Sequence, residues 1–428
     1  MILILILVSL VILLLTGLPI FAGLGLVSIF LLLITEGQIS SLGEIVFGKL
    51  NIYLLVAIPM FAFMAHVMIK SKVIDDLFDT AHTMVRHLPG GLGVATVLSC
   101  TIFAAISGSS VATALTIGST AIPQMKRFGY RLRDTYGVVA AGGTLGILIP
   151  PSGPLILYGV VSETSIGALF IAGLLPGLLL AFIFAAFCVL KNLSIVEGGR
   201  ENRASILEIF RSLKKSFWAL LLPPLVLGGM YFGVFTATEA AGVGAISAVL
   251  IATFIYKNFG LNDLLESARK TTQLTAMLFM ILASAAIFGH VLTIMELPSA
   301  LVSSVTRAGV GSIAFILLTM TVIFILGMFL ETIAIILVTT PIILPTLESL
   351  SIDPVWFGIL LMINLELALI TPPVGMNLFV IKGIANAPMD DIIYGIFPYV
   401  GLMILGLIFV LIFPQLALWL PSTMGYGL

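Results

Sequence analysis

Long apolar stretches, separated by short polar segments, recur from one end of the chain to the other. A run of about 17 or more apolar residues is long enough, as a helix, to cross a hydrocarbon layer of roughly 30 Å. The pattern therefore predicts membrane-spanning helices at residues 1–15, 17–34, 52–69, 136–162, 168–190, 217–235, 240–256, 273–290, 355–385 and 395–415. Gly17 and Pro19 interrupt residues 1–34, so the pattern leaves open whether these form one kinked helix or two.

Two further segments, 70–91 and 293–310, are amphipathic and too polar to span a membrane. In the first of them Val73, Leu77 and Ala81 recur at the spacing of one helix face, with charged residues between them. Such segments are typical of helices that lie in the membrane interface. We expect both to brace the spanning helices.

The composition agrees with a protein whose main solvent is lipid. Of the 428 residues, 60% are hydrophobic and 9% are charged, whereas a soluble domain carries about 25% charged residues. The fold class we predict is an all-α polytopic membrane protein. A net charge of −1 gives no basic field for nucleic acid. Cys100 and Cys188 lie far apart in apolar runs and are interpreted as core residues.

Comparison of the sequence with itself indicates two related halves. At a constant offset of 222 positions, four prolines coincide: Pro123 with Pro345, Pro150 with Pro372, Pro151 with Pro373, and Pro176 with Pro398. Because proline makes up only about 5% of an average protein, these coincidences favour a true internal repeat. We therefore divide the chain into a first repeat at 1–190, a linker at 191–216 and a second repeat at 217–428.

The distribution of Lys and Arg predicts that the two halves are inserted in opposite orientations. Short basic loops stay in the cytoplasm. The loop 125–135 contains four basic residues, whereas its counterpart 347–357 contains none, and the linker 191–216 contains six. Equivalent loops thus face opposite sides, which is the inverted-topology repeat of secondary transporters. We expect a multi-pass protein of the bacterial cytoplasmic (inner) membrane with a cytoplasmic linker.

A re-entrant hairpin is predicted at 92–124 and again at 313–347. The arms of the first are about 15 residues long, roughly 22 Å as helix and too short to cross the membrane alone. Its tip is the polar stretch 107–110, and the second tip lies at 327–332. Non-helical backbone at membrane depth is tolerated only where it is buried or lines a wet cavity. The alternative is a helix-packing surface of small residues, which the matching second unit disfavours.

A second paired element is a helix broken by two adjacent prolines. Pro150 and Pro151 interrupt the stretch 136–162, and their counterparts at 372 and 373 interrupt 355–385. Adjacent prolines remove two backbone donors and free carbonyl groups of the preceding turn. A helix broken in this way presents carbonyl oxygens to a cation and a half-helix N-terminus to an anion. A simple proline kink is the other interpretation, and twin breaks beside twin hairpins favour a binding site.

The chemistry of these elements suits sodium and an organic anion, because hydroxyl and carbonyl oxygens, which hard cations prefer, outnumber charges there. The predicted ligands of a first sodium site are Ser107, Ser109, Ser110, Gly146, Ile149 and Pro150. Those of a second sodium site are Gly327, Glu331, Thr332, Thr371, Pro372 and Met376. The predicted anion-binding residues are Ser109, Ser110, Thr113, Pro151, Ser152 and Asn377.

Three carboxylates lie within or beside membrane-depth runs, where a charge is costly and often functional. Glu331 occupies the second tip and is the first of them to test. Glu239 either caps a helix or takes part in transport, and Glu366 either hydrogen-bonds across the broken helix or takes part in transport. The histidines lie at span ends or on an amphipathic segment and predict no metal cluster: His66, His82, His87 and His290.

The sequence around these elements resembles the large membrane subunit of TRAP (tripartite ATP-independent periplasmic) transporters, the DctM-like family. The stretches that carry the resemblance are AAISGSSVAT at 104–113, GTLGILIPPSGPLILYGV at 143–160, TATEAAGVGA at 236–245, GMFLETIAIILVTTPIILP at 327–345 and NLELALITPPVGMNLFV at 364–380. It covers essentially the whole chain. The tip S-G-S-S-x-A-T and the N-L-E before T-P-P look like C4-dicarboxylate members, while sialic-acid members share most of the remaining pattern.

The resemblance implies an elevator mechanism, in which a transport domain with both hairpins slides against a scaffold. It implies organic acid uptake by secondary active transport, with two or more Na⁺ as coupling ions. It also implies two partners, a periplasmic substrate-binding protein and a small four-helix membrane subunit. The outward-facing Arg307 is a candidate contact for the binding protein.

Three other functions are weighed against this one. A stand-alone sodium–carboxylate symporter would share the hairpins and breaks but would transport without a binding protein. A channel would need an open pore, whereas inverted repeats with hairpins are typical of alternating access. An enzyme would need a catalytic constellation at membrane depth, such as a histidine cluster or a Ser/Lys pair, and the sequence suggests none. We therefore expect no enzymatic activity.

Overall fold

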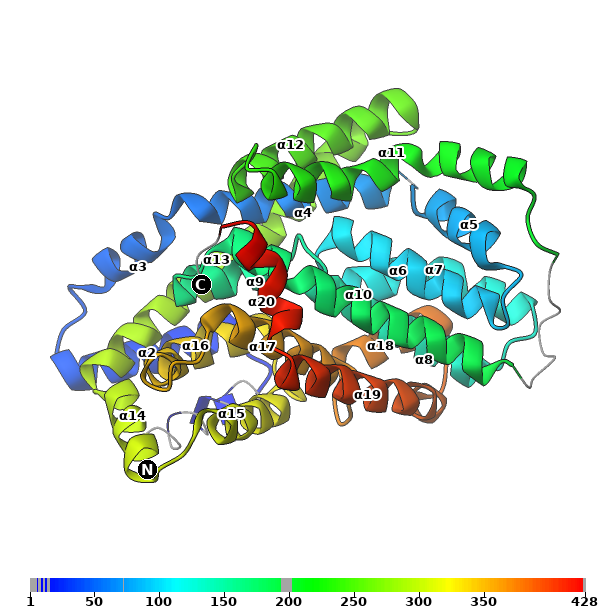
Figure 1. The fold of residues 1–428 in the computed structure, drawn as a ribbon. Helices are drawn as coiled ribbons and strands as arrows, with labels where there is room; N and C mark the ends of the chain where they lie inside the picture. Colours follow the sequence, from blue (N-terminus) through cyan, green and yellow to red (C-terminus); the bar gives the residue numbers. More distant parts are fainter. Residues whose placement is uncertain are drawn as a thin grey trace.

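The structure, a computed structural model, describes residues 6, 9–10, 12–13, 16–71, 73–193 and 202–425, and its regular structure in these residues is helical (Figure 1). This confirms the predicted all-helical class. The predicted span 1–15 falls largely outside the described residues. The interruption after it is present, because Gly17 has a φ of 86° and α2 (Ile20–Glu36) begins directly after Pro19.

The first half of the chain folds into short and medium helices. After α2 these are α3 (Leu42–Leu50), α4 (Ala57–Lys70), α5 (Val73–Val85), α6 (Gly91–Ser107), α7 (Ser110–Arg127), α8 (Leu132–Leu148), α9 (Gly153–Ser162) and α10 (Ile166–Lys191). A 3-10 turn, Tyr53–Val56, leads into α4. Helix α3 was not predicted, because its nine residues contain two glycines and two charges. The amphipathic segment predicted at 70–91 is helical as α5.

The second half repeats this order and adds a long helix. It contains α11 (Ile206–Tyr231), α12 (Ala237–Leu250), α13 (Leu261–Ile294), α14 (Leu297–Arg307), α15 (Ser312–Gly327), α16 (Thr332–Ser349), α17 (Pro354–Leu369), α18 (Met376–Ala385), α19 (Met389–Ile412) and α20 (Gln415–Thr423). A π-helical turn, Ile251–Ile255, follows α12. Helix α13 has 34 residues and exceeds the predicted span 273–290, because its polar first part is also helical.

The helices follow the offset seen in the sequence. Helix α16 begins and ends 222 positions after α7, and α17 begins 222 positions after α8. In both halves two helices joined by a short tip, α6–α7 and α15–α16, precede a helix that is broken in the middle, α8–α9 and α17–α18. The two hairpin units and the two breaks are therefore structural counterparts.

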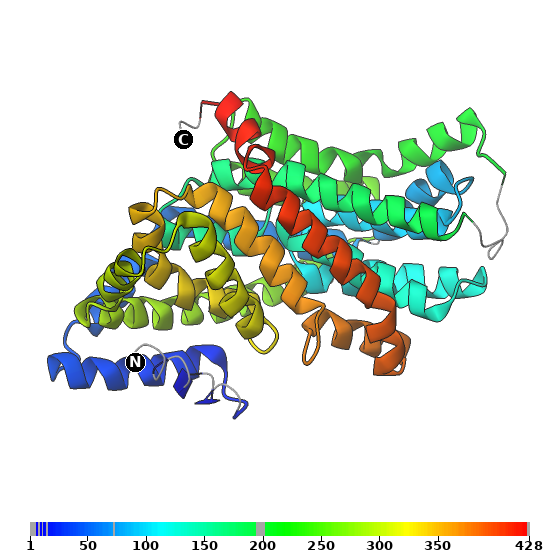
Figure 2. The same ribbon diagram turned by 60° about the horizontal axis from the view of Figure 1, so that its bottom comes forward.

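Two groups of helices can be distinguished by their contacts. The first, which we call the flanking group, consists of α2, α4, α11, α12 and α13. In it α13 packs against α2 and α4, and α12 packs against α4 and α11. The second, the central group, consists of α6–α10 and α15–α19, in which α8 packs against α6, α7 and α19. Figure 1 shows α4, α11 and α12 together along the upper edge, and Figure 2 shows α19 running across the central group. The groups meet where α4 contacts α6 and α9, and where α13 contacts α16.

Seven helices or helix pairs among the described residues are long and apolar enough to cross a membrane. The most exposed large side chains on α10 and α19 are apolar, and Phe182 and Phe397 are 71% and 74% exposed. Such side chains are stable in contact with lipid but not with water. The chain is therefore a multi-pass membrane protein.

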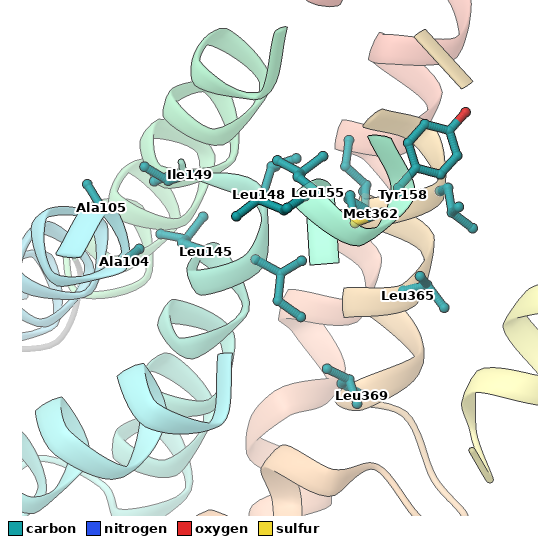
Figure 3. Close-up of a cluster of buried hydrophobic side chains, with 14 of the residues drawn as sticks. Ala104, Ala105, Leu145, Leu148, Ile149, Leu155, Tyr158, Met362, Leu365 and Leu369 are labelled. Carbon is teal, nitrogen blue, oxygen red and sulfur yellow. The ribbon is translucent and has the colours of Figure 1, made fainter. Parts of the chain in front are cut away.

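The two broken helices meet in the interior of the central group. Figure 3 shows their buried side chains packed together, among them Leu148, Leu155, Met362, Leu365 and Leu369. The Tyr158 hydroxyl of α9 donates a hydrogen bond of 2.7 Å to the Pro354 carbonyl at the start of α17. Because lipid is as apolar as leucine, close packing and such interhelical bonds are what hold helices together in a membrane.

Candidate functional site

Both predicted tips border one cavity of about 350 Å³. The first tip contributes residues 107–112, and the second contributes residues 331–333. The halves of the broken helices add residues on both sides of each break, and α4 and α13 of the flanking group close the remaining wall. Among the side chains that line the cavity, Glu331 is the acidic one and His66 the basic one. The cavity therefore lies between the two groups of helices, at the meeting point of the tips.

The first tip is held by bonds within its own turn. Gly108 ends α6 with a φ of 59°, and a side chain there would collide with the Pro151 carbonyl. Ser109 caps α7 by accepting a hydrogen bond of 3.4 Å from its first turn. Thr113 donates to the Ser109 carbonyl at 2.8 Å, and its hydroxyl is 2.8 Å from that of Ser107.

The first break packs directly against this tip. Residues 149–152 are all buried, and the peptide bond between Pro150 and Pro151 is cis. Ser152 caps α9 by accepting a hydrogen bond of 3.4 Å from its first turn. A Cβ on Gly146 would lie 2.5 Å from the Ser109 carbonyl oxygen. Glycine at 146 is thus required for α8 to approach the backbone of the tip.

Ser110 joins the first tip to both broken helices. Its hydroxyl lies 3.1 Å from the Gly143 carbonyl and 2.8 Å from Glu366 Oε2, and it accepts a bond of 2.9 Å from Asn377 Nδ2. All three polar side chains are at most 2% exposed. Four helices, α7, α8, α17 and α18, therefore converge on one hydroxyl group.

Two acceptor oxygens of this cluster lack a donor. Asn377 Oδ1 is buried without a hydrogen-bond partner. The Glu366 carboxylate lies near the backbone N–H of Ile147, and its Oε1 is buried without a hydrogen-bond partner. A buried acceptor without a partner costs free energy, and two of them beside a shared hydroxyl provide oxygens that a cation can use.

The second tip is more open. Glu331 begins α16 at its N-cap position, but its side chain makes no capping bond. The Thr332 side chain is buried and lines the cavity. A Cβ on Gly327 would lie 2.6 Å from the Ala368 Cβ, so this tip also packs tightly on its broken helix, through side-chain atoms instead of backbone.

The second break repeats the geometry of the first with different surroundings. The peptide bond between Pro372 and Pro373 is cis, as in the first break. The Thr371 hydroxyl donates 2.6 Å back to the Leu367 carbonyl, and Gly375 has a φ of 54°. Residues 371–374 are half-buried or exposed, whereas the four residues of the first break are buried.

The predicted site residues divide into two sets. Those that line the cavity are Ser107, Ser109, Ser110, Pro151, Glu331, Thr332 and Met376. The others lie behind this lining or at the breaks: Thr113, Gly146, Ile149, Pro150, Ser152, Gly327, Thr371, Pro372 and Asn377. Asn377 reaches the first tip through its bond to Ser110.

The sequence left the roles of two carboxylates open, and it missed the place of one histidine. Glu239 caps α12, where it accepts hydrogen bonds of 2.8 Å from the backbone and the hydroxyl of Thr236. Glu366 bonds across from α17 to the first tip. His66 borders the cavity from α4, which no local pattern indicated. No three His, Cys, Asp or Glu side chains are grouped to hold a metal in the part of the chain that the structure describes.

Known proteins resemble the chain over almost its whole length. The family pattern described as "Tripartite ATP-independent periplasmic transporter, DctM component" matches residues 7–416. The C4-dicarboxylate TRAP transporter large permease protein DctM of Pseudomonas aeruginosa is 40% identical over 395 residues, 92% of each chain. The sialic acid TRAP transporter large permease protein SiaM of Vibrio cholerae is 32% identical over 419 residues, 97% of each chain. The ectoine TRAP transporter large permease protein TeaC of Halomonas elongata is 33% identical and covers 95% of this chain and 96% of its own.

Solved structures resemble the fold at low sequence identity. The YdaH transporter of Alcanivorax borkumensis superimposes with a TM-score of 0.65 and 12% identity, over 91% of this chain and 88% of its own. MtrF of Neisseria gonorrhoeae gives a TM-score of 0.61 and 13% identity, over 91% and 85%. At such identities the likeness concerns the fold.

Proposed function

The chain belongs to the DctM family of large permease components of tripartite ATP-independent periplasmic transporters, and from this premise we propose that it imports an organic anion with sodium as the driving ion. A permease component moves its substrate across the membrane and is not expected to transform it. The observation that carries the proposal is that both tips, rich in hydroxyl and carbonyl oxygens, meet at one cavity to which both broken helices contribute residues.

The oxygen atoms at the first tip suit a sodium ion. Hard cations bind hydroxyl, carbonyl and carboxylate oxygens, and the first tip and break offer such atoms on Ser107, Ser109, Ser110, Gly146, Ile149 and Pro150. Glu366 Oε1 and Asn377 Oδ1, which have no hydrogen-bond partner, lie in the same cluster. A positive charge would stabilise these two oxygens. A bound sodium ion would supply that charge and would hold the tip against α8.

The second tip offers a comparable set with a carboxylate. Its members are Gly327, Glu331, Thr332, Thr371, Pro372 and Met376. Because the Glu331 side chain makes no capping bond, its oxygens are available to a cation. Two sodium ions, one at each tip, would also attract an anion into the cavity between them.

The proposed substrate is a carboxylate held by Ser109, Ser110, Thr113, Pro151, Ser152 and Asn377. Relatives are named for C4-dicarboxylate, sialic acid and ectoine. The sequence of the first tip favours a C4-dicarboxylate, with sialic acid as the second choice. The half-helix N-terminus at Ser152 adds a favourable dipole for the anion.

We further propose an elevator mechanism in which the central group moves against the flanking group. The cavity lies at the boundary between the groups, so such a motion would carry the site from one side of the membrane to the other. The hairpins α6–α7 and α15–α16 would be re-entrant from opposite sides of the inner membrane. A periplasmic binding protein would deliver the substrate, and a small four-helix membrane subunit would complete the transporter.

Reconstitution tests this function. The protein is placed in liposomes with its small subunit, and uptake of labelled succinate or sialic acid is measured with and without a binding protein and an inward sodium gradient. The proposal predicts uptake that needs both. Uptake that is independent of the sodium gradient would refute the coupling to sodium. Uptake without any binding protein would instead indicate a stand-alone symporter.

A further inference from the structure

The wall that the flanking group contributes to the cavity carries a single polar side chain. From α4 and α13 the lining residues are Ile58, Phe61, Ala62, Ala65, His66, Ile69, Leu274 and Leu278. The opposite wall, made by the tips and breaks, carries hydroxyl groups and Glu331 and no Lys or Arg. His66 is therefore the one side chain of the cavity lining that can become a cation.

The hydrogen bonds around His66 fix its orientation. Its Nδ1 lies 2.9 Å from the Thr271 hydroxyl of α13. Thr271 has a single hydroxyl proton and donates it to the Ser267 carbonyl at 2.8 Å. The Thr271 oxygen must then accept from His66, so Nδ1 carries the proton. Nε2 has no partner among the described residues and is left with a lone pair.

Few charged groups surround the imidazole. On α13, Lys270 interacts with it electrostatically and is itself paired with Glu266 at 2.9 Å. Glu266 also binds Lys70 of α4 at 2.6 Å, with Asp263 3.6 Å from the same amine. Helices α6 and α9, which also pack on α4, contain no charged residue. Helix α5 contains Asp75, Asp76, Asp79 and His82, and α12 contributes only the capping Glu239. Across the cavity, Glu331 is the acidic lining residue.

We propose that His66 is the contact of the flanking group for the transported anion, with Nε2 pairing with a carboxylate of the substrate. This inference rests on the proposed function. A carboxylate oxygen and the neutral Nε2 are both acceptors, so they form a hydrogen bond only when one proton from water enters between them. The resulting imidazolium donates through Nδ1 to Thr271 and through Nε2 to the substrate.

Substrate binding is thereby linked to the uptake of one proton. The bound state holds one proton more than the free state, so the affinity is highest at low pH and falls as the pH rises. The contact also differs in kind from those at the tips. His66 sits on the group that the elevator motion leaves in place, so its bond to the substrate must break when the central group moves.

Sodium-dependent binding of labelled succinate to the purified complex with the small subunit tests the inference. Between about pH 6.5 and pH 8.5, the dissociation constant of the unaltered protein should rise by up to about tenfold per pH unit. In His66→Gln the rise should be lost, and at pH 6.5 the affinity should fall about tenfold, as for the loss of one charge-assisted bond. Thr271→Val keeps the imidazole but removes the hydrogen-bond partner of its Nδ1. The pH dependence of this variant should be reduced but not abolished.

His290→Gln is the matched control, because His290 lies at the other end of α13 and pairs with Glu36 at 3.1 Å. It should retain the full pH dependence. A pH dependence unchanged in both His66→Gln and Thr271→Val would overturn the role of His66 and leave the proposed function standing. An absence of sodium-dependent succinate binding by the unaltered protein would overturn the proposed dicarboxylate substrate and this inference with it.

Discussion

The first and second tips are structural counterparts with different chemistry. Ser110 of the first tip and Thr332 of the second are 222 positions apart, and both begin a helix of the same length. The Ser110 hydroxyl accepts a hydrogen bond from Asn377 and lies within hydrogen-bond distance of the Gly143 carbonyl and Glu366 Oε2, on three other helices. Thr332 lines the same cavity as Ser110 but has no side-chain hydrogen bond in the described structure. The first tip is thus held by hydrogen bonds to its neighbours, and the Thr332 hydroxyl of the second tip is not.

The same contrast holds for the residue that precedes each helix and for the breaks. The Ser109 side chain caps α7, whereas the side chain of its counterpart Glu331 makes no capping hydrogen bond to α16. The first break is buried, and the second is partly exposed. A repeat therefore preserves the backbone arrangement while each half specialises. We infer that the first tip is preorganised by its own hydrogen bonds and that the second tip keeps its polar side chains available to a ligand.

The largest effect is expected from Gly146→Ala. Its Cβ would lie 2.5 Å from the Ser109 carbonyl oxygen and 2.8 Å from the Ser110 nitrogen, and backbone atoms cannot rotate away. Overpacking of this kind costs about 1–3 kcal/mol and would displace the first tip. We expect sodium-driven uptake in liposomes to be lost. Gly242→Ala, where nothing lies within 4 Å of the added atom, should transport normally, and normal uptake by both variants would contradict the preorganised first tip.

Ser110→Ala and Thr332→Ala compare the tips directly. Loss of the Ser110 hydroxyl leaves Glu366 Oε2 and Asn377 Nδ2 without their partner, a cost of about 1–3 kcal/mol that should raise the half-saturating sodium concentration tenfold or more. Thr332→Ala removes no internal bond and should raise it by about threefold. Ser119→Ala, which loses only a local bond on the exposed side of α7, is the control. Equal shifts at the two tips would show that the contrast between them has no functional meaning.

Thiol labelling should distinguish the two breaks. Ser152 and Val374 are counterparts, and Ser152 is fully buried while Val374 is half-buried. In a background whose native Cys100 and Cys188 are buried, Val374→Cys should react about tenfold faster with a water-soluble maleimide than Ser152→Cys, because local opening limits the latter. Addition of sodium should slow the Val374→Cys reaction. Similar rates at both positions would contradict the difference in burial.

A smaller effect than that of Ser110→Ala is expected from Glu331→Gln. The change keeps the shape of the side chain and removes one negative charge from the second tip, so it should weaken sodium binding by about three- to fivefold. Glu348→Gln on the exposed end of the same helix is the control. An unchanged sodium dependence in Glu331→Gln would remove this carboxylate from the second site.

The sequence predicted the tips and breaks because they depend on local chemistry. Glycine permits the turn conformations that other residues avoid, and adjacent prolines interrupt a helix wherever they occur. The repeat offset placed these residues in pairs. Contacts across the molecule left no such signal. The bond between Ser110 and Glu366 joins residues 256 positions apart, and that between His66 and Thr271 spans 205.

Some helices also escaped prediction, for physical reasons. Helix α3 has too many glycines and charges for a spanning pattern. The first part of α13 contains charged and polar residues, which a spanning pattern excludes. The two broken helices were not predicted as continuous helices, because the adjacent prolines indicated a break within each apolar stretch.

Sodium coupling at both tips is tested most directly by the number of sodium ions that accompany each substrate molecule. Fluxes of radioactive sodium and labelled substrate would be measured together in liposomes that contain the complete transporter and its binding protein. We expect at least two sodium ions per substrate for the unaltered protein, and a lower ratio when either Ser110 or Thr332 is replaced by alanine. A substrate flux without any sodium flux would contradict this coupling.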